Sequence, residues 1–183
     1  AGDQLAPFGF LIAERAMVSF FGVSRYVARF LPLVCGLASL VLFQRLARRV
    51  LEFQAAVVAV ALFALSTDQI YYSSELKPYV CDLAVSLGIM LLAVRLGHGR
   101  GTEWDFAGFG LLAAAAPWFS FPSSFVIAGC GLALVWECSR RGRNRELVGL
   151  LAIGGCWLAS AAGSYITSRW LLNPSTTMYL FWD

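Results

Sequence analysis

Charged side chains are scarce in this sequence. Asp, Glu, Lys and Arg make up 14% of its 183 residues, whereas hydrophobic residues make up 59%. Soluble domains typically carry about 25% charged residues, so this composition excludes a water-soluble globule. A bilayer core about 30 Å thick requires roughly 20 apolar residues per helix, and several such runs are present. Because backbone groups in lipid must hydrogen-bond within the chain, we expect an all-α, polytopic bundle of transmembrane helices.

Metal-binding residues are equally sparse. The chain has a single histidine, His98, and its five cysteines include no C-x-x-C pair. These counts argue against a zinc site, so we expect the cysteines to be small apolar packing residues. We expect no cofactor, and nothing in the sequence indicates a divalent metal.

The first apolar residues lack the basic region and the small-residue cleavage site of a secretory signal peptide. The chain begins at Ala1 rather than at a methionine, and it stops at Asp183 directly after an aromatic stretch. No linker or repeat divides it. We therefore expect residues 1–183 to form a single transmembrane domain that is truncated at both ends.

The formal net charge of +3 does not indicate a nucleic-acid partner, because most basic residues gather at the ends of apolar runs. Three clusters hold nine of the 14 Lys and Arg residues: Arg45, Arg48 and Arg49; Arg95 and Arg100; and Arg140, Arg141, Arg143 and Arg145. Such clusters are typical of the cytoplasmic ends of membrane helices. An even number of passes must therefore separate each pair of clusters.

That parity predicts six membrane spans: 27–43, 54–70, 79–94, two short passes within 106–138, and 147–170. The short passes follow from Pro117 and the Phe121-Pro122-Ser123-Ser124 turn, which divide that run. Residues 7–21 contain Glu14 and Arg15, which favour a helix lying at the outer interface rather than a span. Its aromatic residues Phe8, Phe10, Phe20 and Phe21 are then expected to insert into the acyl boundary.

The densest polar break between two apolar runs is Tyr71-Tyr72-Ser73-Ser74-Glu75-Leu76-Lys77-Pro78-Tyr79, which we call the outer segment because the parity places it outside. A lysine beside tyrosine hydroxyls is suited to a phosphate head group, and Glu75 can orient a hydroxyl or pair with Lys77. The alternative is an interfacial tyrosine belt with a surface ion pair. Asp82, one turn into the next span, requires a cationic partner such as Lys77 or a neighbouring arginine, or else a polar cavity.

Three motifs follow one another from residue 3 to residue 79: Asp3-Gln4-Leu5-Ala6-Pro7-Phe8; Phe21-Gly22-Val23-Ser24 followed by Arg29 and Pro32; and Tyr72-Ser73-Ser74-Glu75-Leu76-Lys77-Pro78-Tyr79. In this order they resemble the GT-C superfamily of membrane glycosyltransferases, in particular the bacterial relatives of protein O-mannosyltransferases and lipid A aminoarabinose transferases. The third motif is the most specific, being similar to the family's Tyr-Ser-x-Glu-x-Arg-Pro-Tyr. The resemblance covers about half of the chain, to about Leu96.

The resemblance implies that a sugar linked to polyprenyl phosphate is the donor, and that a glycan, lipid or protein hydroxyl is the acceptor. It also implies that the site lies at the outer or periplasmic face of a bacterial inner membrane. It implies Asp3 as the catalytic base, and Gln4, Tyr72, Glu75, Lys77 and Tyr79 as substrate-binding residues. The family's acidic motif normally precedes the position of Asp3, and its arginine is Lys77 here, a point charge rather than a bidentate fork. The alternative function is a carrier or flippase-like protein for a polyprenyl-linked sugar, which would use the same polar pocket without a base.

Overall fold

The computed structural model describes residues 7–75, 77–99 and 101–171. Within these ranges the chain is helical and contains no β-strand, which confirms the predicted all-α class. The helices are α1 (Phe8–Phe21), α2 (Arg25–Val50), α3 (Phe53–Ala64), α4 (Thr67–Ser74), α5 (Tyr79–Gly97), α6 (Glu103–Phe119), α7 (Ser123–Arg140) and α8 (Asn144–Leu171).

Three of the described helices are long and apolar enough to cross a membrane. They are Arg29–Val50 of α2, Tyr79–Gly97 (α5) and Asn144–Ser168 of α8. A fourth crossing is formed if α3 and α4 count as one span, bent by 51° at their break. The chain therefore has the helices of a membrane protein, with three or four candidate spans, and the predicted count of six is not confirmed.

The run 106–138 divides into two helices, α6 and α7, at the expected Phe121-Pro122-Ser123-Ser124 turn. The chain turns between Phe119 and Ser123, whereas Pro117 lies inside α6. Hydroxyls of α8 bond to carbonyls around this proline: Ser164 donates to the carbonyl of Pro117 at 2.8 Å, and Ser160 donates to that of Ala114. The neighbouring helix thus supplies hydrogen bonds where a proline weakens the helical ladder.

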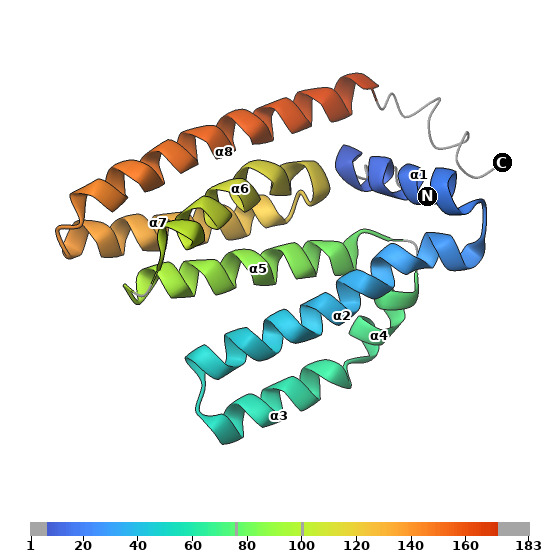
Figure 1. The fold of residues 1–183 in the computed structure, drawn as a ribbon, viewed down its shortest axis with the longest axis horizontal. Helices are drawn as coiled ribbons and strands as arrows, with labels where there is room; N and C mark the ends of the chain where they lie inside the picture. The colour runs from blue at the N-terminus through green and yellow to red at the C-terminus, as the bar shows by residue number, and fades with distance from the viewer. Residues whose placement is uncertain (1–6, 76, 100, 172–183) are drawn as a thin grey trace.

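The chain reverses direction at two ends of the bundle, which Figure 1 shows. The α2–α3, α5–α6 and α7–α8 connections lie together at one end, and the last turns of α2, α5 and α7 bring Arg48, Arg49, Arg95 and Arg140 there. The α4–α5 connection and the α6–α7 turn lie at the opposite end. We call the arginine-bearing end the inner end and the opposite end the outer end, where the outer segment lies.

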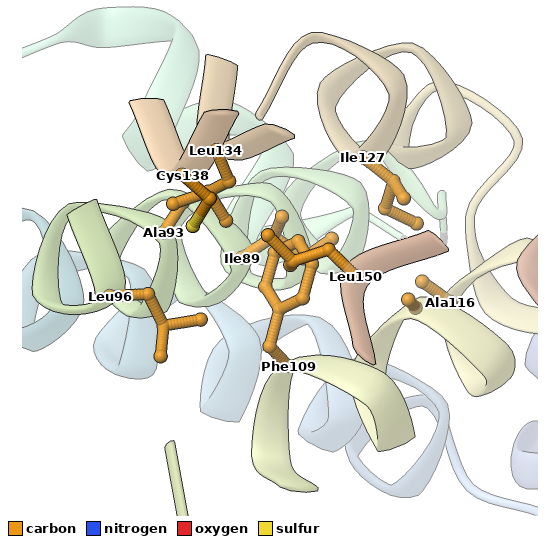
Figure 2. Close-up of a cluster of buried hydrophobic side chains, with 10 residues drawn as sticks. Ile89, Ala93, Leu96, Phe109, Ala116, Ile127, Leu134, Cys138 and Leu150 are labelled. Carbon is orange, nitrogen blue, oxygen red and sulfur yellow. The ribbon is translucent and has the colours of Figure 1, made fainter. Parts of the chain in front are cut away.

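The core lies where α5, α6, α7 and α8 pack together, as Figure 2 shows. Ile89 of α5 and Phe109 of α6 are 0% and 2% exposed, and Leu134 and Leu150 of the other two helices are almost as buried. Lipid tails are as apolar as these side chains, so close packing rather than exclusion of water stabilises such contacts in a bilayer. The core thereby holds the second half of α5, the helix whose first residue belongs to the outer segment.

An ion pair ties α5 to α6 at the inner end. Thr102 and Asp105 form a capping box at the start of α6, in which the Thr102 side chain accepts from the Asp105 amide and the Asp105 carboxylate accepts from the Thr102 amide. The same carboxylate lies 3.0 Å from the guanidinium of Arg95 and is almost completely buried. The Asp105 side chain therefore holds together the start of α6, the loop before it and the neighbouring helix α5.

α1 is a helix, as expected, but it packs against the bundle more closely than a purely interfacial helix would. It contacts α2, α6 and α8, and Phe10 is 5% exposed, so the prediction that Phe10 inserts into lipid is wrong. Phe20 and Phe21 are largely exposed. A Cβ atom at Gly9 would lie 2.6 Å from the carbonyl oxygen of Trp118, so only glycine permits this approach to α6.

Two cysteines meet between α2 and α5. The Sγ atoms of Cys35 and Cys81 are 2.9 Å apart, about 0.9 Å longer than a disulfide bond. Diamide accepts two electrons and two protons from a pair of thiols, and we expect it to link these two cysteines. Mass spectrometry after alkylation should find Cys130, Cys138 and Cys156 still alkylated. Full alkylation of Cys35 and Cys81 after oxidation would contradict the packing of α2 on α5.

Candidate substrate site at the outer end

The outer segment comprises the end of α4, a short link and the start of α5. α4 ends at Ser74, and Glu75 is extended, with φ −101° and ψ 149°. Pro78 occupies the N-cap position of α5, where the missing N–H of proline costs nothing. α5 therefore begins at Tyr79, the residue at which the sequence predicted the span 79–94 to begin.

The predicted pair of Glu75 and Lys77 is present. The Lys77 ammonium lies 2.9 Å from Glu75 Oε2, and the Tyr71 hydroxyl donates to Glu75 Oε1. The ammonium also lies 5.9 Å from the centre of the Tyr72 ring, within the range of a cation–π contact. Lys77 is the only lysine of the chain, and nearly half of its side chain is exposed. It is accordingly a cation that an external anion can reach.

These contacts keep both partners ionised. The pKa of Glu75 lies below its ordinary value, mainly because Tyr71 donates a hydrogen bond to the carboxylate and secondly because Lys77 does. The pKa of Lys77 is raised, chiefly by its hydrogen bond to Glu75. Because the pKa of Glu75 is lowered, the pair stabilises the segment above the ordinary glutamate pKa, and this contribution disappears as the pH falls through the lowered value.

Tyr71→Phe tests this arrangement. We expect the variant to raise the pKa of Glu75 towards that of an ordinary glutamate, because it removes the largest cause of the lowering and leaves Lys77 in place. Carbon-13 NMR of labelled glutamate carboxyls over a pH series measures the shift, with Glu75→Gln assigning the signal. An unchanged midpoint in Tyr71→Phe would show that Tyr71 does not bond to Glu75.

A pocket of about 220 Å³ opens beside the outer segment, between the α3–α4 break and the start of α5. Its walls combine aromatic, apolar and polar side chains: Phe63, Ser66, Asp68, Gln69, Tyr72, Tyr79, Val80 and Leu83. The Tyr72 and Tyr79 rings meet edge to face with centroids 5.0 Å apart. Of the predicted substrate-binding residues, the two tyrosines therefore line the pocket, whereas Glu75 and Lys77 lie next to it.

Side chains of α2 fix the position of α4 behind this pocket. The Ser39 hydroxyl donates to the Gly36 carbonyl at 2.8 Å, and it accepts from the Gln69 amide at 2.7 Å. A Cβ atom at Gly36 would lie 2.9 Å from that of Ser73, so glycine is needed for the two helices to approach. Neither Asp68 nor Gln69 was predicted as a site residue. The Ser-Thr-Asp start of a new helix was the signal for their position.

Asp82 is not among the residues that line the pocket. Among the described residues no cation pairs with it, and its polar neighbour is Ser120 in the α6–α7 turn. Its Oδ1 atom is buried without a hydrogen-bond partner in the described part of the chain. Of the alternatives left open for Asp82, the pairing with Lys77 is not formed, because Lys77 contacts Glu75 and Tyr72 instead.

Two predicted site residues, Asp3 as the base and Gln4 as a substrate-binding residue, lie outside the described residues. Within residues 7–75, 77–99 and 101–171, no three His, Cys, Asp or Glu side chains gather as a metal site. The site thus combines the reachable cation Lys77, the carboxylate of Glu75, whose pKa the charge of Arg29 also lowers, and an aromatic pocket at the outer end. Comparison with family models, with curated proteins and with solved structures finds no match to this chain.

Proposed function

We propose that the protein transfers a glycosyl group from a sugar linked to polyprenyl phosphate onto an acceptor hydroxyl at the outer face of a bacterial inner membrane. One observation carries this proposal: an accessible lysine, its carboxylate partner and a tyrosine-lined pocket gather at the end opposite the arginine clusters. By the positive-inside rule the arginine end is cytoplasmic, so the polar site faces outwards. In this topology α6 and α7 complete a six-span bundle.

The chemistry requires a positive charge and a base. In the transfer, the bond between the sugar and the phosphate oxygen breaks, the acceptor oxygen bonds to the sugar, and the acceptor proton passes to a carboxylate. Lys77 stabilises the departing polyprenyl phosphate, and Glu75 positions Lys77. Asp3 remains the proposed base, and Gln4 a proposed substrate-binding residue. The glycan, lipid or protein that provides the hydroxyl approaches from the aqueous side.

A carrier for a polyprenyl-linked sugar is the second candidate, and the bent α3–α4 pair favours it. Transporter sites are often built at discontinuous helices, and these two helices meet at an angle of 51° beside the pocket. Against it, the charges of the site lie at one end of the bundle, whereas a carrier moves its cargo past the midplane. The two candidates differ in whether the bond between sugar and phosphate is broken.

Reconstituted protein distinguishes them. Proteoliposomes receive undecaprenyl phosphate that carries radiolabelled mannose, glucose or aminoarabinose, together with a cell-envelope extract as acceptor. Transfer releases free undecaprenyl phosphate and moves label to the acceptor, and we expect Glu75→Gln to slow it. Movement of intact donor across the bilayer without release would support the carrier. Equal turnover by the wild type, Glu75→Gln and Lys77→Ala would show that the assigned site is wrong.

A further inference from the structure

The pocket beside the outer segment contains two polar side chains, Asp68 and Gln69, to which the mechanism above gives no role. We propose that this pocket binds the sugar ring of the lipid-linked donor, with Asp68 and Gln69 accepting hydrogen bonds from its hydroxyls. The proposal rests on the proposed transfer and names the place of the donor's sugar within that site.

The aromatic walls suit a sugar ring. The C–H bonds of a pyranose carry partial positive charge because of the neighbouring oxygens, and the face of a tyrosine ring is negative. Tyr72 and Tyr79 meet at an interplanar angle of 78°, so their rings form a corner rather than a parallel slot. Phe63, Val80 and Leu83 complete the apolar side. A ring with one apolar and one hydroxylated side can therefore contact both kinds of wall.

Gln69 has a defined orientation. The Ser39 hydroxyl gives its only proton to the Gly36 carbonyl, so its oxygen can only accept from Gln69. This places the amide nitrogen of Gln69 towards Ser39 and leaves the carbonyl oxygen Oε1 without a described partner. Ser39 is completely buried, so the arrangement is shielded from water. Gln69 therefore offers a positioned acceptor.

Asp68 is the only acidic side chain that lines the pocket. It is exposed, and no cation of the described residues forms an ion pair with it. Its place in the first turn of α4 also suits the helix dipole, and that alone would explain an aspartate here. The helix dipole does not explain why a carboxylate, an oriented amide oxygen and two tyrosines lie around the same pocket.

The size and position of the pocket fit a sugar attached to a lipid. At about 220 Å³ it is smaller than the roughly 300–1,000 Å³ pockets of drug-sized ligands, a size that suits a single sugar ring. Among the described helices, α3 contacts only α2 and α4 and lies at the edge of the bundle (Figure 1). The Lys77 ammonium next to the Tyr72 ring places the phosphate-binding cation beside the sugar.

Competition between glycosylated and bare carrier tests the proposal. Native mass spectrometry of the protein in nanodiscs compares undecaprenyl phosphate with undecaprenyl phosphate that bears mannose, glucose or aminoarabinose. The wild type should prefer at least one glycosylated carrier. Asp68→Ala should reduce that preference about tenfold or more, the loss expected for a hydrogen bond to a charged group, and should bind bare carrier as before. The control is Thr67→Ala, an exposed neighbour that does not line the pocket.

An unchanged preference in Asp68→Ala, or no preference of the wild type for any of the three sugars, would overturn this inference. In either case, the proposed transfer site would still be supported if the wild type bound bare undecaprenyl phosphate and Lys77→Ala bound it more weakly. Failure of the bare carrier to depend on Lys77 would instead count against the proposed function itself. The two failures are therefore distinguishable in one set of spectra.

Discussion

Lys77→Ala is expected to lower glycosyl transfer about a hundredfold. Removing one group that stabilises developing negative charge typically costs about 10²–10³ in kcat, and Lys77 is the cation that the structure places at the outer segment. The measurement is release of undecaprenyl phosphate from its glycosylated form under saturating donor. Because the side chain is 46% exposed, its loss should leave the fold intact, which circular dichroism can verify.

Lys77→Arg is the matched variant. It keeps the charge and adds a bidentate fork, so most activity should survive. Glu75→Gln should change the affinity for bare carrier and the rate of transfer in opposite directions. It removes a carboxylate that competes with phosphate for Lys77, so bare carrier should bind several-fold more tightly while turnover falls. Lys77→Ala with wild-type turnover would remove the phosphate-binding role from this segment.

Arg95→Ala is expected to destabilise the bundle by about 2–3 kcal/mol. The variant leaves the Asp105 carboxylate, 5% exposed, with Thr102 donors but without its cation. Stranding one partner of a buried ion pair costs about 3–5 kcal/mol, and Arg95 is 37% exposed, which lowers that figure here. The free energy of unfolding in mixed detergent micelles measures the loss.

Arg141→Ala provides the control, since it also removes an arginine from an ion pair at the inner end. Its partner Glu137 is 33% exposed and Arg141 is 51% exposed, so the expected loss is below about 1 kcal/mol. If the two variants lost equal stability, burial of Asp105 would not be the reason for the effect of Arg95→Ala.

The sequence predicted helices where it had long apolar runs between arginine clusters. α2, α5 and α8 were predictable because each combines such a run with a charged or glycine-bearing end. The break between α3 and α4 was missed because the apolar composition of 54–70 does not show where the chain bends. Ser66, Thr67 and Asp68 are nevertheless a recognisable helix start. Pro117 was expected to help divide the run 106–138 but lies inside α6, because the sequence does not show the hydrogen bonds that α8 donates around it.

The candidate site was predictable in part for a similar reason. Glu75 and Lys77 are close in sequence, so their pairing is a local property. The pocket depends on how α4 leans against α2, through Gly36, Ser39 and Gln69, and these contacts join residues more than 29 positions apart. No local sequence pattern predicts such contacts. The same limitation left the surroundings of Asp82 open between a cationic partner and a polar cavity, and the structure places it beside Ser120.

The sidedness of the outer segment tests the central claim most directly. In a cysteine-free background, Ser74→Cys and Asn144→Cys each place one exposed thiol, at the outer end and at the inner end respectively. Intact spheroplasts are treated with a membrane-impermeant maleimide. The account predicts that Ser74→Cys is labelled at once, and that Asn144→Cys is labelled only after the membrane is permeabilised. Labelling of both from outside, or of Asn144→Cys alone, would contradict an outward-facing site.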